Sequence, residues 1–313
     1  MSTATSMTTS ASSRTYVEAR DVATAVAAMS AGARPIAGGT DLVVGARHGK
    51  APLPAALVGI HRIPGLGDVA PTDGGGLRIG ALVTHATLMA DPTVLASYPG
   101  LADASAIVGS HATRANGTLG GNVMNSSPAM DTGAPLLCHG GVAVLVGPVG
   151  ERRVALADLW TGPGRSTAAP DELLVAVELD ALPAGGASGS SYVRLQYRRQ
   201  MEIAIVGAGA VVTLGADGTV TGAKVAITAL APVIHRVAES EAALVGTDGG
   251  FEAAKAAGAA AAAAARPISD VRGSADYRRA MAAVITRRAV LTAVRRARGE
   301  SVPVPASDTT FGS

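Results

Sequence analysis

The sequence predicts an α+β protein in which two small α/β lobes precede a C-terminal domain of antiparallel strands and helices. A chain of 313 residues is long enough for about two domains of roughly 150 residues each. The first part of the chain alternates strand and helix patterns, whereas antiparallel strand patterns and then long helical patterns follow position 190. We therefore expect a disordered tail at 1–14, a two-lobed domain at 15–184 with lobes of about 15–65 and 66–184, a domain at 190–298 and a flexible tail at 299–313.

Cap residues and apolar periodicity locate the elements of the two lobes. A Ser, Thr or Asp before an apolar run marks a helix start, and short apolar runs between turn residues mark strands. In the first lobe these signals predict a helix at Val22–Ser30, capped by Asp21 and ended by Gly32, and strands at Arg34–Ala37 and Leu57–Ile60. In the second lobe they predict strands at Leu77–Ala81, Val142–Val146, Arg153–Ala155 and Glu172–Leu179, and helices at His85–Ala90, after the cap Thr84, and Pro99–Gly109.

A glycine pair follows the second predicted strand, in the segment PIAGGTDL. Gly38 and Gly39 come after the strand, and Thr40 and Asp41 lie at the start of a helix. Free backbone N–H groups at such a helix start suit a phosphate. An ordinary strand–turn–helix corner, with Asp41 as the helix cap, is the alternative interpretation. The segment is not a P-loop, because the Lys-Ser/Thr ending is absent, and it is not a GxGxxG fingerprint.

A second glycine pair lies between Thr113 and Leu137, in TRANGTLGGNVMNSSPAMDTGAPLL, which has the composition of a loop that wraps a ligand. Gly120 and Gly121 let backbone N–H groups approach a bulky anion, and an ordinary glycine turn is the alternative. The two glycine pairs lie in separate lobes, about eighty positions apart, so they could face each other across a cleft and hold a diphosphate. The polar side chains around the second pair are those of Thr118, Asn122, Asn125, Ser126 and Asp131.

The C-terminal domain is predicted from alternating strands and a helical remainder. The segment LPAGGASG at 182–189 is the best linker, because it is rich in Gly and Pro. Three strands then form an antiparallel meander with a turn at Asp217-Gly218. The predicted strands are Tyr192–Arg198, Ile203–Leu214 and Val220–Leu230, and the predicted helices are Val237–Val245, Phe251–Ala265 and Ala275–Arg298.

Composition and charge exclude several classes of function. Aromatic residues make up only 3% of the chain, so there are few platforms on which exposed bases could stack. The net charge of +2 is too small to attract DNA or an anionic membrane. The N-terminus is rich in Ser and Thr and lacks a basic start followed by an apolar segment, which predicts neither a secretion signal nor membrane insertion. We expect a cytoplasmic protein that binds no nucleic acid.

Residue spacing gives little support for metal or thiol chemistry. Cys138 is the only cysteine, so the chain can form no internal disulfide and no cysteine-ligated iron–sulfur cluster. The six histidines show no HxxxH pairing and no neighbouring carboxylate of the kind that marks a zinc site. No nucleophile–base pair or carboxylate pair marks a catalytic site either, so we expect a bound cofactor to carry the chemistry.

Three motifs together resemble the FAD-binding, or medium, subunit of the molybdenum hydroxylases. They are AGGTDL at Ala37–Leu42, TLGGNVMNSSPAMD at Thr118–Asp131 and YRRQMEIA at Tyr197–Ala204, and the resemblance extends from about Tyr16 to Arg298. This family includes xanthine dehydrogenase, carbon monoxide dehydrogenase and dehydrogenases of N-heterocycles. The resemblance implies a two-lobed α/β FAD-binding domain of the vanillyl-alcohol-oxidase/PCMH type, followed by a C-terminal domain with a three-stranded antiparallel sheet and helices.

The resemblance also implies which residues hold FAD. The two glycine segments would hold the pyrophosphate from opposite sides, and Asp131 would accept hydrogen bonds from ribose hydroxyls. Leu174 matches a position where the backbone meets the cofactor, and Arg194 stands where some relatives carry a lysine near the flavin, although arginine cannot titrate there. The implied cofactor-binding residues are Ala37, Gly38, Gly39, Thr40, Asp41, Thr118, Gly120, Gly121, Asn122, Asn125, Asp131, Leu174 and Arg194; no catalytic residue and no metal ligand is implied.

The same resemblance implies that this chain is one subunit of a complex, a heterotrimer or its dimer. A large subunit would carry the molybdenum cofactor, a molybdopterin, and a small subunit would carry 2Fe–2S clusters. Electrons would pass from an organic substrate at molybdenum through the clusters and FAD to an external acceptor. Two alternatives are a stand-alone FAD-dependent reductase of the same fold and a scaffold subunit that has lost the cofactor.

Several reactive or charged residues have a structural interpretation beside the functional one. We interpret Cys138 as a buried small hydrophobe rather than a redox thiol. Tyr197 either shields the flavin or fills the seam between the domains. The arginines of the C-terminal part are interpreted as solvated faces rather than partner contacts; they are Arg198, Arg199, Arg278, Arg279, Arg287, Arg288, Arg295 and Arg296.

Overall fold

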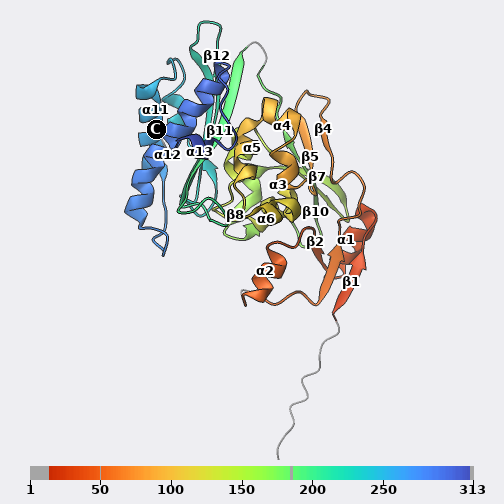
Figure 1. Cartoon of the computed structure of the whole chain (residues 1–313). Helices are drawn as coiled ribbons and strands as arrows, with labels where there is room; N and C mark the ends of the chain where they lie inside the picture. Colours follow the sequence, from red (N-terminus) through yellow and green to blue (C-terminus); the bar gives the residue numbers. More distant parts are fainter. Residues whose placement is uncertain (1–13, 50, 184–185, 311–313) are drawn as a thin grey trace, which may run out of the picture.

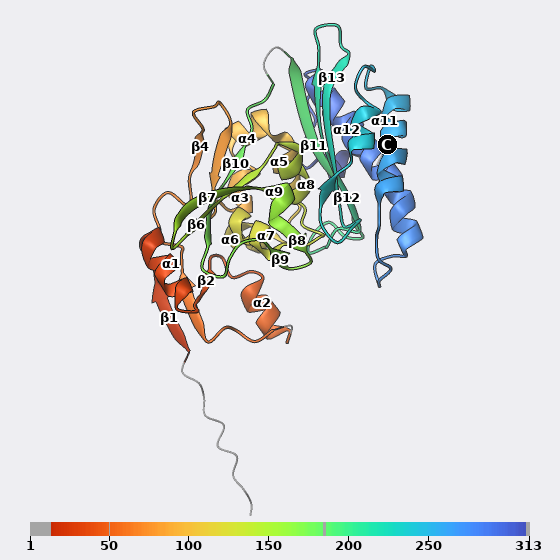
Figure 2. The same cartoon turned by 180° about the vertical axis from the view of Figure 1, so that it is seen from behind.

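The computed structural model describes residues 14–49, 51–183 and 186–310. It confirms the predicted α+β class. The N-terminal unit and the C-terminal unit lie on opposite sides of a central unit in both views (Figures 1 and 2). The predicted tail at 1–14 lies outside the described residues except for Arg14, and so does the middle of the predicted linker, at 184–185.

The N-terminal unit is a three-stranded parallel sheet with the strand order β1-β3-β2. Helix α1 begins where the sequence predicts, because the Asp21 side chain accepts a hydrogen bond from Thr24 N at 2.7 Å. Its apolar face packs toward the central unit. The elements are β1 (Thr15–Glu18), α1 (Val22–Ser30), β2 (Arg34–Ile36), α2 (Leu42–Arg47) and β3 (Ala56–Gly59).

The central unit is built on a five-stranded antiparallel sheet with the order β4-β5-β10-β6-β7. Successive side chains of a strand point to opposite faces. On β6, Ala143 and Leu145 pack with the helices of the central unit, while Val144 packs with the N-terminal unit. This sheet therefore joins two cores. Its strands are β4 (Val69–Pro71), β5 (Leu77–Gly80), β6 (Val142–Gly147), β7 (Gly150–Ala155) and β10 (Leu173–Leu179).

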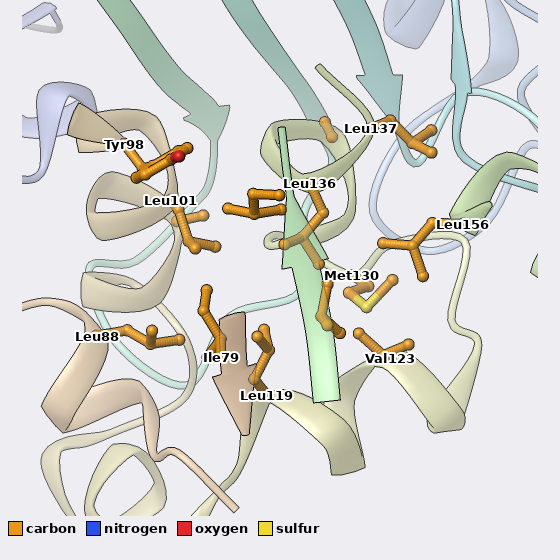
Figure 3. Close-up of a cluster of buried hydrophobic side chains, with 14 of the residues drawn as sticks. Ile79, Leu88, Tyr98, Leu101, Leu119, Val123, Met130, Leu136, Leu137 and Leu156 are labelled. Atoms are coloured by element: carbon orange, nitrogen blue, oxygen red, sulfur yellow. The ribbon is translucent and has the colours of Figure 1, made fainter. Parts of the chain in front are cut away.

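Short helices cover the face of this sheet that points away from the N-terminal unit. Leu88, Leu101, Leu119 and Leu136 from these helices pack around Ile79 of the sheet (Figure 3). A two-stranded ribbon of β8 and β9 follows them along the chain. The elements are α3 (His85–Leu88), α4 (Pro92–Ser97), α5 (Pro99–Ala106), α6 (His111–Asn116), α7 (Leu119–Asn125), α8 (Gly133–Cys138), α9 (Leu156–Leu159), β8 (Trp160–Gly162) and β9 (Arg165–Ser166).

The stretch from Thr113 to Leu137 is largely helical, where its composition suggested a loop. Most of it belongs to α6, α7 and α8. The hydroxyls of Ser110 and Thr118 accept hydrogen bonds from the first turns of α6 and α7. Glycine and small polar residues have low helix propensity, but capping and burial against the sheet outweigh that preference here. The glycine pair at positions 120 and 121 consequently lies inside a helix.

The C-terminal unit is an antiparallel sheet with the order β11-β12-β13-β14, covered on one face by α12 and α11. Three of its strands form the predicted meander, and the two-residue strand β14 adds a fourth. The other face packs on the central unit, where a Cβ on Gly209 would lie 3.1 Å from the backbone of Ala134. The elements are β11 (Ala187–Leu195), β12 (Val206–Leu214), β13 (Val220–Thr228), β14 (His235–Arg236), α10 (Ala238–Ala242), α11 (Phe251–Ala264), α12 (Ala275–Ala297) and α13 (Ala306–Thr310).

A buried ion pair joins the central and C-terminal units. Asp103 of α5 is fully buried, and its carboxylate accepts hydrogen bonds from Arg296 of α12 at 2.7 and 3.0 Å. The same carboxylate accepts from the backbone N–H groups of Tyr192, at 3.0 Å, and Ala306, at 2.9 Å. All of these donors come from the C-terminal part of the chain, so the charge of Asp103 is compensated only where the two units meet.

Two expectations about the C-terminal part change with the structure. The segment 299–310, expected to be a flexible tail, is docked: Ser307 is fully buried and its hydroxyl accepts from Arg194 N at 3.0 Å. Arg278 and Arg296, expected on solvated faces, are internal. Arg278 is 3% exposed and donates to the Ile205 carbonyl at 3.0 Å. Backbone carbonyls and distant carboxylates hold these guanidinium groups, and neither leaves a local pattern in the sequence.

Replacing Asp103 by Ala should destabilise the protein strongly. The change removes the carboxylate that compensates the buried charge of Arg296 and accepts from the N–H groups of Tyr192 and Ala306. Removing one partner of a buried pair costs roughly 3–5 kcal/mol of unfolding free energy. Asp276→Ala is the matched control, because it removes an exposed pair with Arg279 in which the Asp276 side chain is 94% exposed; such pairs contribute about 0–1 kcal/mol. Equal urea denaturation midpoints for the two variants would contradict a stabilising role for the buried pair of Asp103 and Arg296.

Candidate functional site

The first glycine loop connects β2 to α2 and presents unpaired backbone donors. Gly39 has a φ of +70°, a conformation that residues with a side chain rarely adopt. Within the described ranges, no acceptor is found for the N–H groups of Gly38, Gly39 and Thr40. Asp41 precedes α2 but its side chain makes no capping hydrogen bond, so capping does not account for this residue. The loop therefore offers a row of donors to an anion.

The two glycine segments lie directly against each other, although they belong to different units. A Cβ on Gly38 would lie 1.8 Å from the carbonyl oxygen of Asn116, so only glycine fits at position 38. A Cβ on Gly117 would lie 3.4 Å from the Thr40 hydroxyl oxygen. Ala37, beside the loop, is half-buried against the core of the N-terminal unit. The structure thus brings the first loop to the residues immediately before Thr118.

The second glycine pair contributes differently from the first. Thr118 caps α7 by accepting from Gly121 N at 3.1 Å, and Gly120 N donates to the Ala81 carbonyl at 2.9 Å. The N–H groups of residues 119 and 122 also have acceptors within the protein. These donors, expected to be free for an anion, are therefore already used. A Cβ on Gly120 would lie 2.6 Å from the Ala81 Cβ, whereas Gly121 is exposed and has only the Thr118 hydroxyl within 4 Å of that position.

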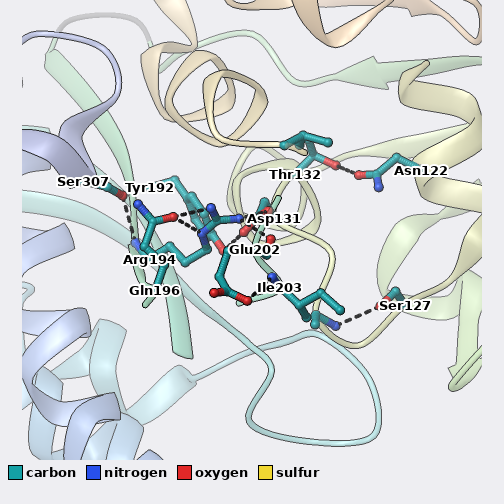
Figure 4. A network of polar contacts seen from close by, with 12 residues as sticks. Asn122, Ser127, Asp131, Thr132, Tyr192, Arg194, Gln196, Glu202, Ile203 and Ser307 are labelled. Carbon is teal, nitrogen blue, oxygen red and sulfur yellow. Dashed lines mark hydrogen bonds and ion pairs between the residues drawn. The ribbon is translucent and has the colours of Figure 1, made fainter. Parts of the chain in front are cut away.

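Helix α7 carries two asparagines, one at its middle and one at its last position. Asn122 is half-buried, and its Oδ1 accepts from the hydroxyl of Thr132 at 2.6 Å (Figure 4). Its NH2 group is thus the part that can serve a ligand. Asn125 is the last residue of α7 and is exposed. The next residue, Ser126, has a φ of 50° and ends the helix in the left-handed conformation.

Asp131 and Arg194 form a second buried ion pair between the central and C-terminal units (Figure 4). Arg194 Nη1 donates to Asp131 Oδ2 at 2.7 Å, and the Tyr192 hydroxyl donates to Asp131 Oδ1 at 2.8 Å. Burial raises the pKa of Asp131, and the guanidinium and the phenol oppose that rise. Arg194 is fully buried and also donates to Gln196 Oε1. Both carboxylate oxygens of Asp131 accept hydrogen bonds within the protein, and acceptance from ribose hydroxyls stays a prediction.

Leu174 lies on β10, at the one place where the pairing of β10 with β6 is irregular. The register shifts between Leu174 and Ala176, which marks a β-bulge. The Leu174 side chain is 3% exposed and belongs to the core of the central unit. Only its backbone is therefore suited to meet a ligand, and a contact there stays a prediction.

The sequence did not predict two residues that lie near the contact between the two glycine segments. They are His85 and Arg114. His85 is 2% exposed and its backbone N–H donates to the Gly117 carbonyl at 3.1 Å. Arg114 is 5% exposed and lies on α6, just before Gly117. A single histidine after a capping threonine has the ordinary pattern of a helix start, so the sequence carried no signal for a ligand there.

The burial of Cys138 and the exposure of Tyr197 bear on the interpretations of these two residues. Cys138 is 1% exposed, its thiol donates to the Gly209 carbonyl at 3.5 Å, and burial raises its pKa to about 12. It is a buried small side chain with an unreactive thiol. Tyr197 is 66% exposed and its hydroxyl donates to the Arg272 carbonyl at 2.7 Å. Its ring therefore does not fill the seam between the units.

The described ranges hold neither a group of metal-binding side chains nor a helix suited to cross a membrane. No group of three or more His, Cys, Asp and Glu side chains is placed there to hold a metal ion. None of the helices in this part of the chain combines the length and the apolar character that a membrane crossing requires.

Two protein-family models match the chain. The model described as the FAD binding domain in molybdopterin dehydrogenase matches residues 9–181. The model described as the CO dehydrogenase flavoprotein C-terminal domain matches residues 191–293. Together they span the units that carry the two glycine segments and the strand β11.

Individual relatives match over most of their length. The carbon monoxide dehydrogenase medium chain of Afipia carboxidovorans is 34% identical over 286 residues, which is 90% of this chain and 97% of the relative. Subunit alpha of the 6-hydroxypseudooxynicotine dehydrogenase complex of Paenarthrobacter nicotinovorans is 31% identical over 90% of this chain and 95% of its own. A chain in the structure of carbon monoxide dehydrogenase from Hydrogenophaga pseudoflava matches with a TM-score of 0.84 and 31% identity, covering 90% of this chain and 98% of that chain.

Gly38→Ala should lower the FAD content of the purified protein strongly. The new Cβ cannot coexist with the Asn116 carbonyl oxygen, so the first loop must move away from the residues that precede α7. Gly45→Ala is the matched control, because nothing lies within 4 Å of a Cβ at that position of α2, and Ala favours a helix by up to about 1 kcal/mol over Gly. Flavin absorbance per chain measures the effect. Equal flavin content in both variants would show that the contact between the segments is not needed.

Proposed function

The chain belongs to the family of FAD-binding subunits of molybdopterin dehydrogenases, the molybdenum hydroxylases, and on this basis we propose that it passes electrons from partner subunits through FAD to an external acceptor. The family membership gives the cofactor and the class of enzyme, an oxidoreductase. The electron-transfer role is supported by the names of the relatives, one a medium chain of carbon monoxide dehydrogenase and one a subunit of a dehydrogenase complex.

The proposed position of FAD is based on the row of free N–H groups at Gly38, Gly39 and Thr40. A diphosphate has two negative charges and several acceptor oxygens, and adjacent backbone donors in a concave turn bind such groups well. The open surface at Gly121 lies on the segment that packs against this loop. We therefore assign the diphosphate to the space between Thr40 and Gly121.

The remaining predicted residues divide into three groups. Asn122 and Asn125 offer side chains at the accessible side of α7, and we assign them direct contacts with FAD. Others act on the shape of the site: Thr118 and Gly120 fix the start of α7, while the buried pair Asp131–Arg194 holds β11 against the central unit. Ala37, Asp41 and the backbone of Leu174 complete the proposed set.

Bound FAD supplies redox chemistry that can connect one-electron donors, such as iron–sulfur clusters, with a separate acceptor. The residues of this chain hold and orient it. We propose that the donor is a small subunit with 2Fe–2S clusters and that a large subunit with molybdopterin oxidises the organic substrate. The single, buried cysteine supports this division, because cluster ligation needs several accessible thiolates.

Gly121→Asp should abolish FAD retention while the protein stays folded. The new carboxylate would repel the diphosphate, yet a negative charge in the first turn of a helix is favourable for α7 itself. Gly121→Asn is the matched control, since it adds a side chain of the same size without the charge. We expect the Asp variant to lose much more flavin absorbance than the Asn variant at equal thermal stability. Normal flavin content in Gly121→Asp would place the diphosphate elsewhere.

Native purification of the tagged full chain tests the proposed role directly. We expect a small Cys-rich protein and a very large protein to co-purify, with iron and molybdenum in fixed ratio to flavin. A chain that purifies alone with FAD and oxidises NAD(P)H would instead be a stand-alone reductase. A chain that fails to bind FAD in a titration would be a scaffold subunit.

A further inference from the structure

His85 is a buried histidine whose ring has no hydrogen-bond partner among the described residues. It is the first residue of α3, directly after the capping residue Thr84. Its Nδ1 is enclosed and has no partner among the described residues. Buried polar side-chain atoms are nearly always hydrogen-bonded, because an unmade bond is costly. The ring is therefore placed for a reason other than bonds within the chain.

Cδ2 of the His85 ring lies close to Gly117, beside the loop proposed to hold the diphosphate. A Cβ on Gly117 would lie 3.4 Å from His85 Cδ2 and also 3.4 Å from the Thr40 hydroxyl oxygen, so the ring and the hydroxyl converge on one point. In imidazole, Nε2 is bonded to Cδ2. A proton on Nε2 would thus add one more donor beside the free N–H groups of the first loop.

Arg114 places a positive charge near this ring, and within the described ranges no carboxylate lies at ion-pair distance from it. Its Nη1 donates to the Val108 carbonyl at 3.0 Å, and its Nε is buried without a partner. A buried cation without a counter-ion is unfavourable, and a bound anion would relieve that cost. Burial, with a smaller contribution from Arg114, lowers the pKa of His85 to about 4, so the ring is neutral at pH 7 and carries one proton.

We propose that His85 donates a hydrogen bond from Nε2 to the diphosphate of FAD, and that the buried guanidinium of Arg114 supplies a positive charge to the same site. The inference rests on the proposed function, because it takes the ligand of the first glycine loop to be a dinucleotide. It assigns the single proton to Nε2, since Nδ1 has no acceptor within reach. His85 is then a cofactor-binding residue contributed by α3, in addition to the two glycine segments.

Three variants of His85 separate a hydrogen bond from simple packing. His85→Gln keeps an N–H donor near the position of Nε2, His85→Asn carries its amide near Nδ1 instead, and His85→Phe removes both. His139 is the matched control, because it is also buried, at 4% exposure, and its Nε2 also lacks a partner, but its ring packs against Tyr98. His139→Phe should leave FAD binding unchanged.

The experiment measures the affinity of the full chain, stripped of flavin, for FAD, for ADP and for riboflavin. ADP carries the diphosphate without the flavin, and riboflavin carries the flavin without phosphate. A lost hydrogen bond to a charged group predicts that His85→Phe and His85→Asn bind FAD and ADP roughly 10- to 100-fold more weakly, while His85→Gln stays within about threefold of the original chain. Riboflavin affinity should be equal in all of them. Thermal unfolding without ligand checks that each variant is folded.

The outcomes distinguish this inference from the function on which it rests. If the original chain binds FAD and ADP and His85→Phe binds both equally well, the inference is overturned and the placement of FAD stands. If Gln and Asn weaken ADP binding equally, His85 acts through packing, which also overturns it. If the original chain binds neither FAD nor ADP, the proposed function itself fails. Should His85→Phe not fold, the comparison of Gln with Asn decides alone.

Discussion

The carbonyl oxygen of Asn116 occupies the space where any residue other than glycine would carry a Cβ at position 38. The candidate site depends on this approach of two backbones. It holds the loop after β2 against the residues that precede α7, and it places the Thr40 hydroxyl and the His85 ring close to Gly117. A parallel sheet and an antiparallel sheet thereby present one shared surface, which neither unit could form alone.

The two glycine segments on this surface are not equivalent. The N–H groups of the first loop have no acceptors in the described part of the chain, whereas Gly120 N bonds to the Ala81 carbonyl. The first segment therefore contributes hydrogen-bond donors. Helix α7 packs closely at Gly120 and leaves an open surface at Gly121. Glycine is suited to each position for a different physical reason. Gly39 has a positive φ, Gly120 packs on Ala81, and Gly121 leaves space that a ligand can use.

Local chemistry made much of this fold predictable. The cap at Asp21, the cap at Thr84 and the meander around Asp217-Gly218 follow from a few adjacent residues, and each is present. The positions of the two glycine segments along the chain were predictable for the same reason. Their bonding was not, because the acceptor for Gly120 lies near the end of β5, almost forty positions earlier. The buried pair Asp131–Arg194 likewise joins residues 63 positions apart, and nothing local marks either partner as internal.

The hydrogen bonds of Asp103 affect the order in which parts of the chain can fold during synthesis. Its hydrogen-bond donors Tyr192, Arg296 and Ala306 follow it by 89, 193 and 203 positions. A nascent chain that has reached α5 thus holds a carboxylate at a surface destined for the interior, with only water to bond it. Because N-terminal segments leave the ribosome first, the central unit cannot close this face until Arg296 and Ala306 have emerged. A chain that stops before Arg296 and Ala306 would therefore expose Asp103 at an unfinished, charged interface.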